Sequence, residues 1–132
     1  MTEKRPRILI VEDSPAMRQL LAIACRRLPE VVIDQAGDGL AALKAMKEAS
    51  AMPYDLVILD LNMPVMDGMK VLGKMHEDGM IARTTVCVCT TEESEETEQQ
   101  ARALGARYFV RKPVNRRTVE KVLEEVFGLP AA

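Results

Sequence analysis

Residues 54–64 read YDLVILDLNMP, and this stretch decides the fold. Its apolar run, residues 56–59, leads directly into Asp60, and turn-forming residues follow within a few positions. A short, continuous apolar run bounded by turn signals is typical of a strand that is buried on both faces. Asp60 is therefore expected at the carboxyl end of such a strand, which is the edge where open α/β sheets bind their ligands.

Four further strands follow from short apolar runs of the same kind. They are predicted at residues 7–11, from 31 to about 36, at 84–89 and at 107–110, and the strand that carries Asp60 is predicted at 55–60. Apolar residues at helical spacing predict helices at 15–28, from 39 to near 50, from 66 to 78, at 92–104 and at 115–127. Ser14, Asp38 and Asn115 stand where three of these helices begin and are expected to cap their first turns.

The chain alternates strand and helix five times with short connections. Such alternation implies parallel strands joined by right-handed crossovers, with helices on both faces of the sheet. We therefore expect an α/β fold of the doubly wound (βα)5 type. At 132 residues the chain is expected to form a single domain, 1–132, with a core at about 7–127.

The composition argues against several classes of protein. A net charge of −2 disfavours a nucleic-acid or membrane-surface binder, and no apolar run approaches the ~20 residues of a membrane span. Three cysteines and one histidine lack the spacing of a zinc site. We expect reduced, structural thiols and a cytoplasmic location, with no nucleic acid or membrane as partner.

Polar residues follow the predicted strands at one edge of the sheet. The first strand ends at Glu12-Asp13, the third at Asp60 and the fourth at Thr90, and Lys112 follows the fifth. Clustered carboxylates oppose one another's ionisation unless a cation lies among them, and Mg2+ suits carboxylates, water and phosphate oxygens. A hydroxyl and a lysine ammonium are suited to bind phosphoryl oxygens. A carboxylate nucleophile beside a metal and a lysine predicts transfer of a phosphoryl group to Asp60.

Four motifs carry a resemblance to a known family. They are VEDS at 11–14, LDLNMPVMDG at 59–68, Thr90-Thr91 and Lys112-Pro113. In this order and at this spacing they resemble the receiver domain of two-component response regulators, and the similarity extends from about residue 7 to residue 127. The chain looks most like the single-domain regulators of chemotaxis.

The resemblance implies a flavodoxin-like fold with strand order 2-1-3-4-5. It implies that Asp60 is the phosphoacceptor, that Thr90 hydrogen-bonds the phosphoryl group and that Lys112 neutralises it. It also implies a Mg2+ site made of Glu12, Asp13, Asp60 and the backbone carbonyl of Asn62. The peptide bond between Lys112 and Pro113 would be cis.

The resemblance also bears on regulation. Thr90 would act together with the aromatic residue of the fifth strand, Phe109, where many members of the family have tyrosine. Asn62 and Glu92 stand at positions that influence the lifetime of the aspartyl phosphate, and we expect a short lifetime. Thr91 stands where a small residue is usual, and its side chain is expected to narrow access to the phosphoacceptor.

The partners that the resemblance implies are proteins. A histidine kinase or a histidine phosphotransfer protein would donate the phosphoryl group. A downstream protein would bind the surface formed by residues 92–104, 107–110 and 115–127, and phosphorylation would shift a population between two arrangements of that surface. No enzymatic activity is expected beyond assistance of its own phosphorylation and autodephosphorylation.

Three alternatives remain open at this stage. The first is a receiver domain taken from a longer transcription factor or hybrid kinase. The second is a phosphatase with an aspartyl nucleophile, and the third is a flavin-binding electron carrier of the same fold. Such phosphatases generally carry their nucleophile after the first strand, whereas here the third strand carries Asp60. A flavin carrier needs a hydroxyl- and glycine-rich phosphate loop after the first strand, where this chain has the acids Glu12 and Asp13.

Overall fold

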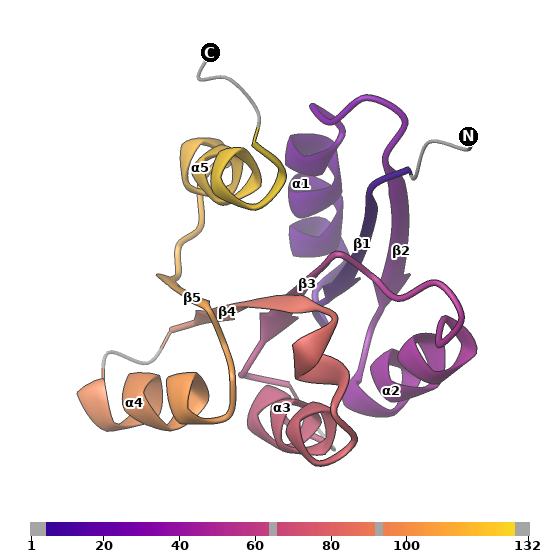
Figure 1. Ribbon diagram of the computed structural model, residues 1–132. Coiled ribbons are helices and arrows are strands. Elements are labelled where there is room, and N and C mark those ends of the chain that lie inside the picture. The colour runs from indigo at the N-terminus through magenta and orange to yellow at the C-terminus, as the bar shows by residue number, and fades with distance from the viewer. Residues whose placement is uncertain (1–4, 64–65, 92–93, 129–132) are drawn as a thin grey trace.

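Five parallel strands form a single sheet with helices on both faces (Figure 1). This computed structural model describes residues 5–63, 66–91 and 94–128. The strands are β1 (Arg7–Val11), β2 (Val32–Ala36), β3 (Leu56–Asp60), β4 (Thr85–Thr90) and β5 (Tyr108–Arg111). They pair in the order β2-β1-β3-β4-β5, which confirms the predicted flavodoxin-like topology.

The helices alternate with the strands as predicted. They are α1 (Pro15–Cys25), α2 (Gly39–Glu48), α3 (Gly68–Glu77), α4 (Glu95–Ala103) and α5 (Arg116–Phe127), with a short 3-10 helix, η1 (Met80–Ala82), before β4. The side chains of Ser14, Asp38 and Asn115 each accept a hydrogen bond from a backbone N–H of the following first turn, which confirms the three predicted caps. In the described part of the chain, none of the helices has the length and apolar character needed to cross a bilayer.

The sheet separates two hydrophobic cores. Helices α1 and α5 cover one face, and α2, α3 and α4 cover the other (Figure 1). The side chains of β1 alternate between the cores, since Ile8 and Ile10 pack on the α1–α5 side and Leu9 and Val11 on the opposite side. Every residue of β3 is buried, which explains why its sequence is continuously apolar rather than alternating.

The edge strand β5 also divides its side chains between the two cores. Phe109 packs on the side of α2, α3 and α4, whereas Tyr108 and Val110 pack on the side of α1 and α5. All three residues are only partly buried. This strand pairs with β4 alone, so one of its two edges has no neighbouring strand in the sheet.

Helix α1 is shorter than the sequence predicts. The expected range was 15–28, whereas the helix ends at Cys25. The N–H groups of Arg27 and Leu28 bond to carbonyls three residues earlier, which is a tighter turn than that of an α-helix. Leu28 is nevertheless buried, which is why the apolar spacing continues to it. The fourth helix begins at Glu95, and its predicted start at residue 92 lies outside the described residues.

Helix α3 begins at Gly68 rather than at residue 66, and its first turn lies against the end of β3. The side chain of Asp67 caps it by accepting a hydrogen bond from the backbone N–H of Lys70. A Cβ added at Gly68 would lie 2.2 Å from the carbonyl oxygen of Asp60 and 2.7 Å from the Cα of Leu61. Glycine is therefore required for α3 to approach the strand this closely.

The two ends of the described chain lie on the edge of the sheet opposite Asp60. β1 begins on that edge, as does every strand of a parallel sheet. α5 returns from the carboxyl end of β5 and runs against the strand direction, so it finishes on the same edge (Figure 1).

Candidate functional site

Three carboxylates meet at the carboxyl ends of the neighbouring strands β1 and β3. β1 ends at Val11, so Glu12 and Asp13 begin its loop, and Asp60 is the last residue of β3. One carboxylate oxygen from each acid lies within 4.8 Å of those of the other two. Glu12 and Asp60 are each only 2% exposed, whereas Asp13 is exposed. The structure thus brings together the three acids that the sequence places at one site.

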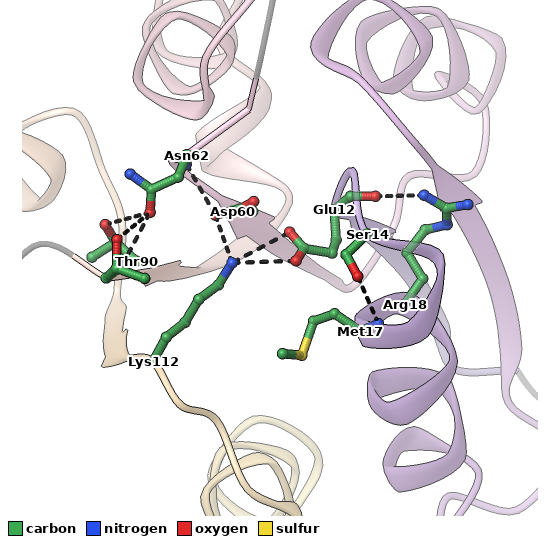
Figure 2. A network of polar contacts seen from close by, with 9 residues as sticks. Glu12, Ser14, Met17, Arg18, Asp60, Asn62, Thr90 and Lys112 are labelled. Carbon is green, nitrogen blue, oxygen red and sulfur yellow. Dashed lines mark hydrogen bonds and ion pairs between the residues drawn. The ribbon is translucent and has the colours of Figure 1, made fainter.

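Lys112 reaches the same site from the loop after β5. Its backbone N–H donates to the carbonyl of Thr90 at 2.8 Å, and the Lys112–Pro113 peptide bond is cis, as the resemblance implied. The ammonium nitrogen Nζ lies 3.1 Å from Asp60 Oδ1 and 3.2 Å from Glu12 Oε1 (Figure 2). One lysine therefore balances two buried carboxylates, which would otherwise be costly to bury.

These contacts give the two buried acids different proton affinities. Burial, together with the neighbouring Asp60 carboxylate, raises the pKa of Glu12 to about 7 against the opposing effect of Lys112. Burial also acts to raise the pKa of Asp60, but hydrogen bonds from Glu12, from the Asn62 N–H and from Lys112 outweigh it and lower that pKa. Burial acts to lower the pKa of Lys112, and the two carboxylates raise it overall. Asp60 is consequently the acid of the pair that stays ionised.

The acid cluster fits a divalent cation. Asp60 Oδ1 contacts Lys112 and accepts the backbone N–H of Asn62 at 2.9 Å. Asp60 Oδ2 is buried and has no hydrogen-bond partner among the described residues. A buried carboxylate oxygen without a partner is unfavourable. A hard cation such as Mg2+, held by oxygens of Glu12, Asp13 and Asp60, would satisfy it.

A group of hydrogen bonds borders the acid cluster at the end of β4. Thr90 is fully buried and lies one residue beyond Cys89, which pairs with Asp60 in the sheet. The side-chain oxygen of Asn62 accepts hydrogen bonds from the Thr90 hydroxyl at 3.1 Å, the Thr91 N–H at 3.0 Å and the Thr91 hydroxyl at 3.2 Å. Sequence reasoning misses this contact. The pattern that could have indicated it is Thr90-Thr91 at the end of one strand and Asn62 after the end of the neighbouring strand.

Two further residues have a predicted regulatory role, and the structure describes one of them, Phe109. Phe109 is half-buried in β5 and pairs with Val88 of β4, two residues before Thr90. Its coupling to Thr90 stays a prediction. Glu92, which was expected to influence the lifetime of a phosphoryl group, lies outside the described residues.

Arg18 is a second residue that sequence reasoning misses. It lies in the first turn of α1, and its Nη1 donates to the carbonyl oxygen of Glu12 at 2.7 Å (Figure 2). Its Nε donates to the side-chain oxygen of Gln35 in β2 at 3.2 Å. Arg18 thereby holds the loop that carries Glu12 and Asp13 against β2. An arginine that reaches from a helix back to the preceding loop leaves no distinctive pattern in the sequence.

Comparison with known proteins gives a family match over most of the chain. The sequence model of the response regulator receiver domain family matches residues 8–124. The matched region contains the whole acid cluster, together with Thr90 and Lys112.

Individual relatives match over nearly the full length of the chain. The chain is 34% identical to the probable chemotaxis protein CheY of Rhizobium etli over 122 residues, which is 92% of each of the two chains. The phosphorylated cyanobacterial phytochrome response regulator RcpA has a TM-score of 0.86 at 25% identity, with 97% of this chain and 98% of the other covered. A chain of the CheX–CheY–BeF3–Mg2+ complex of Borrelia burgdorferi has a TM-score of 0.83 at 28% identity, with 92% and 89% covered.

Proposed function

The chain belongs to the response regulator receiver domain family, and on this premise we propose that Asp60 accepts a phosphoryl group in two-component signal transduction. The observation that carries the proposal is the setting of Asp60, which stays ionised beside Lys112 and two further acids at the edge of the sheet. The donor is a phosphohistidine on a histidine kinase or on a histidine phosphotransfer protein. The output is altered binding of a downstream protein.

The chain's own residues account for the transfer step. A carboxylate oxygen of Asp60 attacks the phosphorus, an O–P bond forms, and the N–P bond to the donor histidine breaks. The imidazole nitrogen keeps the electron pair and binds a proton. Lys112, whose ammonium lies 3.1 Å from Asp60, would neutralise the phosphoryl oxygens, and the Thr90 hydroxyl would donate a hydrogen bond to them.

Mg2+ would be held by Glu12, Asp13, Asp60 and the backbone carbonyl of Asn62. Bound there, it would offset the negative charge of the carboxylates and of the phosphoryl oxygens. The unpartnered Oδ2 of Asp60 supports this assignment. The similar Borrelia burgdorferi complex contains BeF3 and Mg2+, and we extend both ligands to this chain.

Thr90 and Phe109 are proposed to connect the phosphoryl group to the binding surface for the downstream protein. That surface is formed by α4, β5 and α5, and Phe109 lies in the strand at its centre. Movement of the Thr90 hydroxyl toward a phosphoryl group would favour one of two arrangements of this surface. Asn62 and Glu92 would influence the lifetime of the phosphoryl group, which we expect to be short.

We propose that the chain works as a single receiver domain, 1–132, in the cytoplasm. The free, buried thiols of Cys25, Cys87 and Cys89 are consistent with a reducing compartment. Its chemistry would be limited to its own phosphorylation and dephosphorylation.

The test is the mass of the intact protein after incubation with acetyl phosphate and Mg2+. We expect the wild type to gain one phosphoryl group, Asp60→Asn to gain none, and a chelator to prevent the gain. Asp67→Asn is the matched control, because it makes the same chemical change nearby and asparagine caps a helix as well as aspartate does. It should be phosphorylated like the wild type.

Two outcomes would contradict the proposal. No mass gain in the wild type would mean that Asp60 is not a phosphoacceptor. An equal gain in Asp60→Asn would place the phosphoryl group on another residue. The same samples, followed over time after removal of the donor, measure the lifetime, and a half-life of many hours would contradict a short one.

A further inference from the structure

The side chain of Asn62 joins the two loops beside the proposed phosphoacceptor. Its backbone N–H donates to Asp60 Oδ1 at 2.9 Å. Its side-chain oxygen accepts hydrogen bonds from the hydroxyl of Thr90 and from both the N–H and the hydroxyl of Thr91, at 3.0–3.2 Å (Figure 2). Asn62 therefore contacts Asp60 through its main chain and the end of β4 through its side chain.

The donors that Asn62 engages are those that a phosphoryl group on Asp60 would need. Thr90 lies one residue beyond Cys89, the β4 residue paired with Asp60, and the Thr90 hydroxyl and the Asp60 carboxylate both hydrogen-bond to Asn62. A phosphoryl group brings three strong acceptor oxygens, and the ammonium of Lys112 meets only part of that demand. In the unmodified protein the hydroxyl of Thr90 and the N–H of Thr91 are directed at the oxygen of Asn62 instead.

We propose that the side-chain oxygen of Asn62 is an internal ligand, which holds the donors at the end of β4 in the unmodified protein and is displaced when Asp60 is phosphorylated. The inference rests on the proposed phosphorylation of Asp60. Because the contact belongs to the unmodified state alone, it stabilises that state and opposes the phosphorylated one. Asn62 and Thr91 are thus positioning residues that set how readily the site accepts a phosphoryl group.

The hydroxyl of Thr91 strengthens the contact between the Asn62 side chain and the end of β4. A backbone N–H is present at position 91 in any residue but proline, whereas the hydroxyl at 3.2 Å from Asn62 belongs to threonine or serine only. Thr91 is exposed, so small changes to its side chain do not disturb a core. Thr91→Val removes the hydroxyl and keeps the shape, and Thr91→Ser keeps the hydroxyl and removes the methyl group. The pair separates the hydrogen bond from any steric narrowing of access to Asp60.

The probe is beryllofluoride with Mg2+, a non-covalent analogue of a phosphoryl group on a carboxylate. Its dissociation constant can be measured by 19F NMR titration for the wild type, Thr91→Val, Thr91→Ser and Asn62→Ala. Thr91→Val is expected to bind about threefold more tightly, because one exposed hydrogen bond no longer has to break. Asn62→Ala should bind at least as tightly as Thr91→Val, and Thr91→Ser should match the wild type.

The stability of the unliganded proteins supplies a second readout. Thr91→Val and Asn62→Ala should both unfold at a lower temperature than the wild type while binding the probe more tightly. A residue with a merely structural role would lose stability without gaining affinity. This opposite movement of the two quantities is the signature of a contact that exists only in the unliganded state.

The possible failures are distinguishable. If the wild type binds the probe and neither Thr91→Val nor Asn62→Ala binds it more tightly, the proposed role of the Asn62 oxygen as an internal ligand is overturned. Phosphorylation of Asp60 would still stand. Tighter binding by Thr91→Ser than by Thr91→Val would also overturn it, because the bulk of Thr91 would then control the site. Absence of binding in every protein, Asn62→Ala included, would overturn the proposed function and this inference with it.

Discussion

Among single residues, Tyr54 connects β2 to the segment that leads into β3. It lies at the end of β3 opposite Asp60. Its hydroxyl donates to Asp34 Oδ2 of β2 at 2.6 Å, and the guanidinium of Arg7 lies over its ring, 4.9 Å from the centroid. Burial, together with the carboxylate of Asp34, raises the pKa of Tyr54 to about 12. The neutral phenol is therefore the form that the folded state stabilises.

Tyr54→Phe is expected to lower the free energy of unfolding by about 1–2 kcal/mol at neutral pH, because a hydrogen bond to a carboxylate is lost. The phenol ionises near its ordinary pKa of 10.0 in the unfolded chain and near 12 in the folded one. The stabilisation is thus complete below pH 10 and declines as the pH rises toward 12. Urea unfolding of both proteins from neutral pH to about pH 11 measures the difference, which should shrink. A constant difference would contradict the argument.

The charged residues of the site could be predicted from the sequence, whereas the contacts around them could not. Glu12 and Lys112 each follow a strand and Asp60 ends one, and parallel strands bring their carboxyl ends to one edge. The contacts of the Asn62 and Arg18 side chains depend on rotamers in and near loops. Neighbouring parts of the fold select those rotamers, and local sequence does not specify them.

At the scale of an element, α3 depends on close contact with the end of β3. Gly68→Ala is expected to lower the free energy of unfolding by about 1–3 kcal/mol, because a Cβ 2.2 Å from the Asp60 carbonyl forces the helix away from the strand. Gly73→Ala is the matched control in the same helix. It should raise the free energy of unfolding by about 0.5–1 kcal/mol, because nothing lies within 4 Å of the added Cβ.

Urea unfolding of the two alanine variants and of the wild type decides the point. Opposite signs are expected for Gly68→Ala and Gly73→Ala. A stabilised Gly68→Ala would mean that α3 can move away from β3 without loss. The displaced helix should also weaken the Mg2+ binding that is proposed at the acid cluster, since Asp60 ends the strand on which α3 packs.

The starts of helices could be predicted where a capping side chain marks them. Ser14 and Asn115 mark the starts of α1 and α5 correctly, because a side-chain oxygen at that position bonds directly to the first turn. The predicted end of α1 was wrong, because burial of Leu28 continues the apolar pattern, whereas the last hydrogen bond of the α-helical kind is that from the Arg26 N–H to the carbonyl of Ala22. Burial and helical geometry are separate properties, and the spacing of apolar residues indicates burial rather than the end of a helix.

At the scale of the whole molecule, the division of the core by the sheet places all three cysteines on one side. Cys25 of α1 and Cys87 and Cys89 of β4 are buried in the core beneath α1 and α5. Burial raises the pKa of the Cys25 thiol to about 12, and contact with Cys89, together with burial, raises that of Cys87. The reactive thiolate form of these two residues is therefore scarce at neutral pH.

A thiol reagent such as Ellman's is expected to label the native protein far more slowly than the urea-unfolded chain. Labelling of all three cysteines should follow global unfolding. Leu123→Ala, which removes a fully buried side chain from the same core, should accelerate it, because such truncations destabilise proteins by about 2–5 kcal/mol. Fast labelling of one thiol while the other two stay protected would contradict a single cooperative core.

The alternation of strand and helix was enough to predict a parallel sheet with helices on both faces, and the structure confirms both features. The order of the strands required the resemblance to a family. A continuous apolar run such as residues 56–59 shows that a strand is covered on both faces. It carries no information about which strands lie beside it, since backbone hydrogen bonds between strands are the same for every neighbour.

The position of the two chain ends has a practical consequence. The two ends of the described chain, residues 5 and 128, lie on the edge of the sheet opposite the carboxylates, about the length of a strand, ~17 Å, from Asp60. A fluorescent protein or a surface anchor attached beyond residue 5 or residue 128 would therefore be joined to the protein on the edge of the sheet that does not carry Asp60. The fold is accordingly suited to immobilised assays and to sensors whose reporter is attached far from the chemistry it detects.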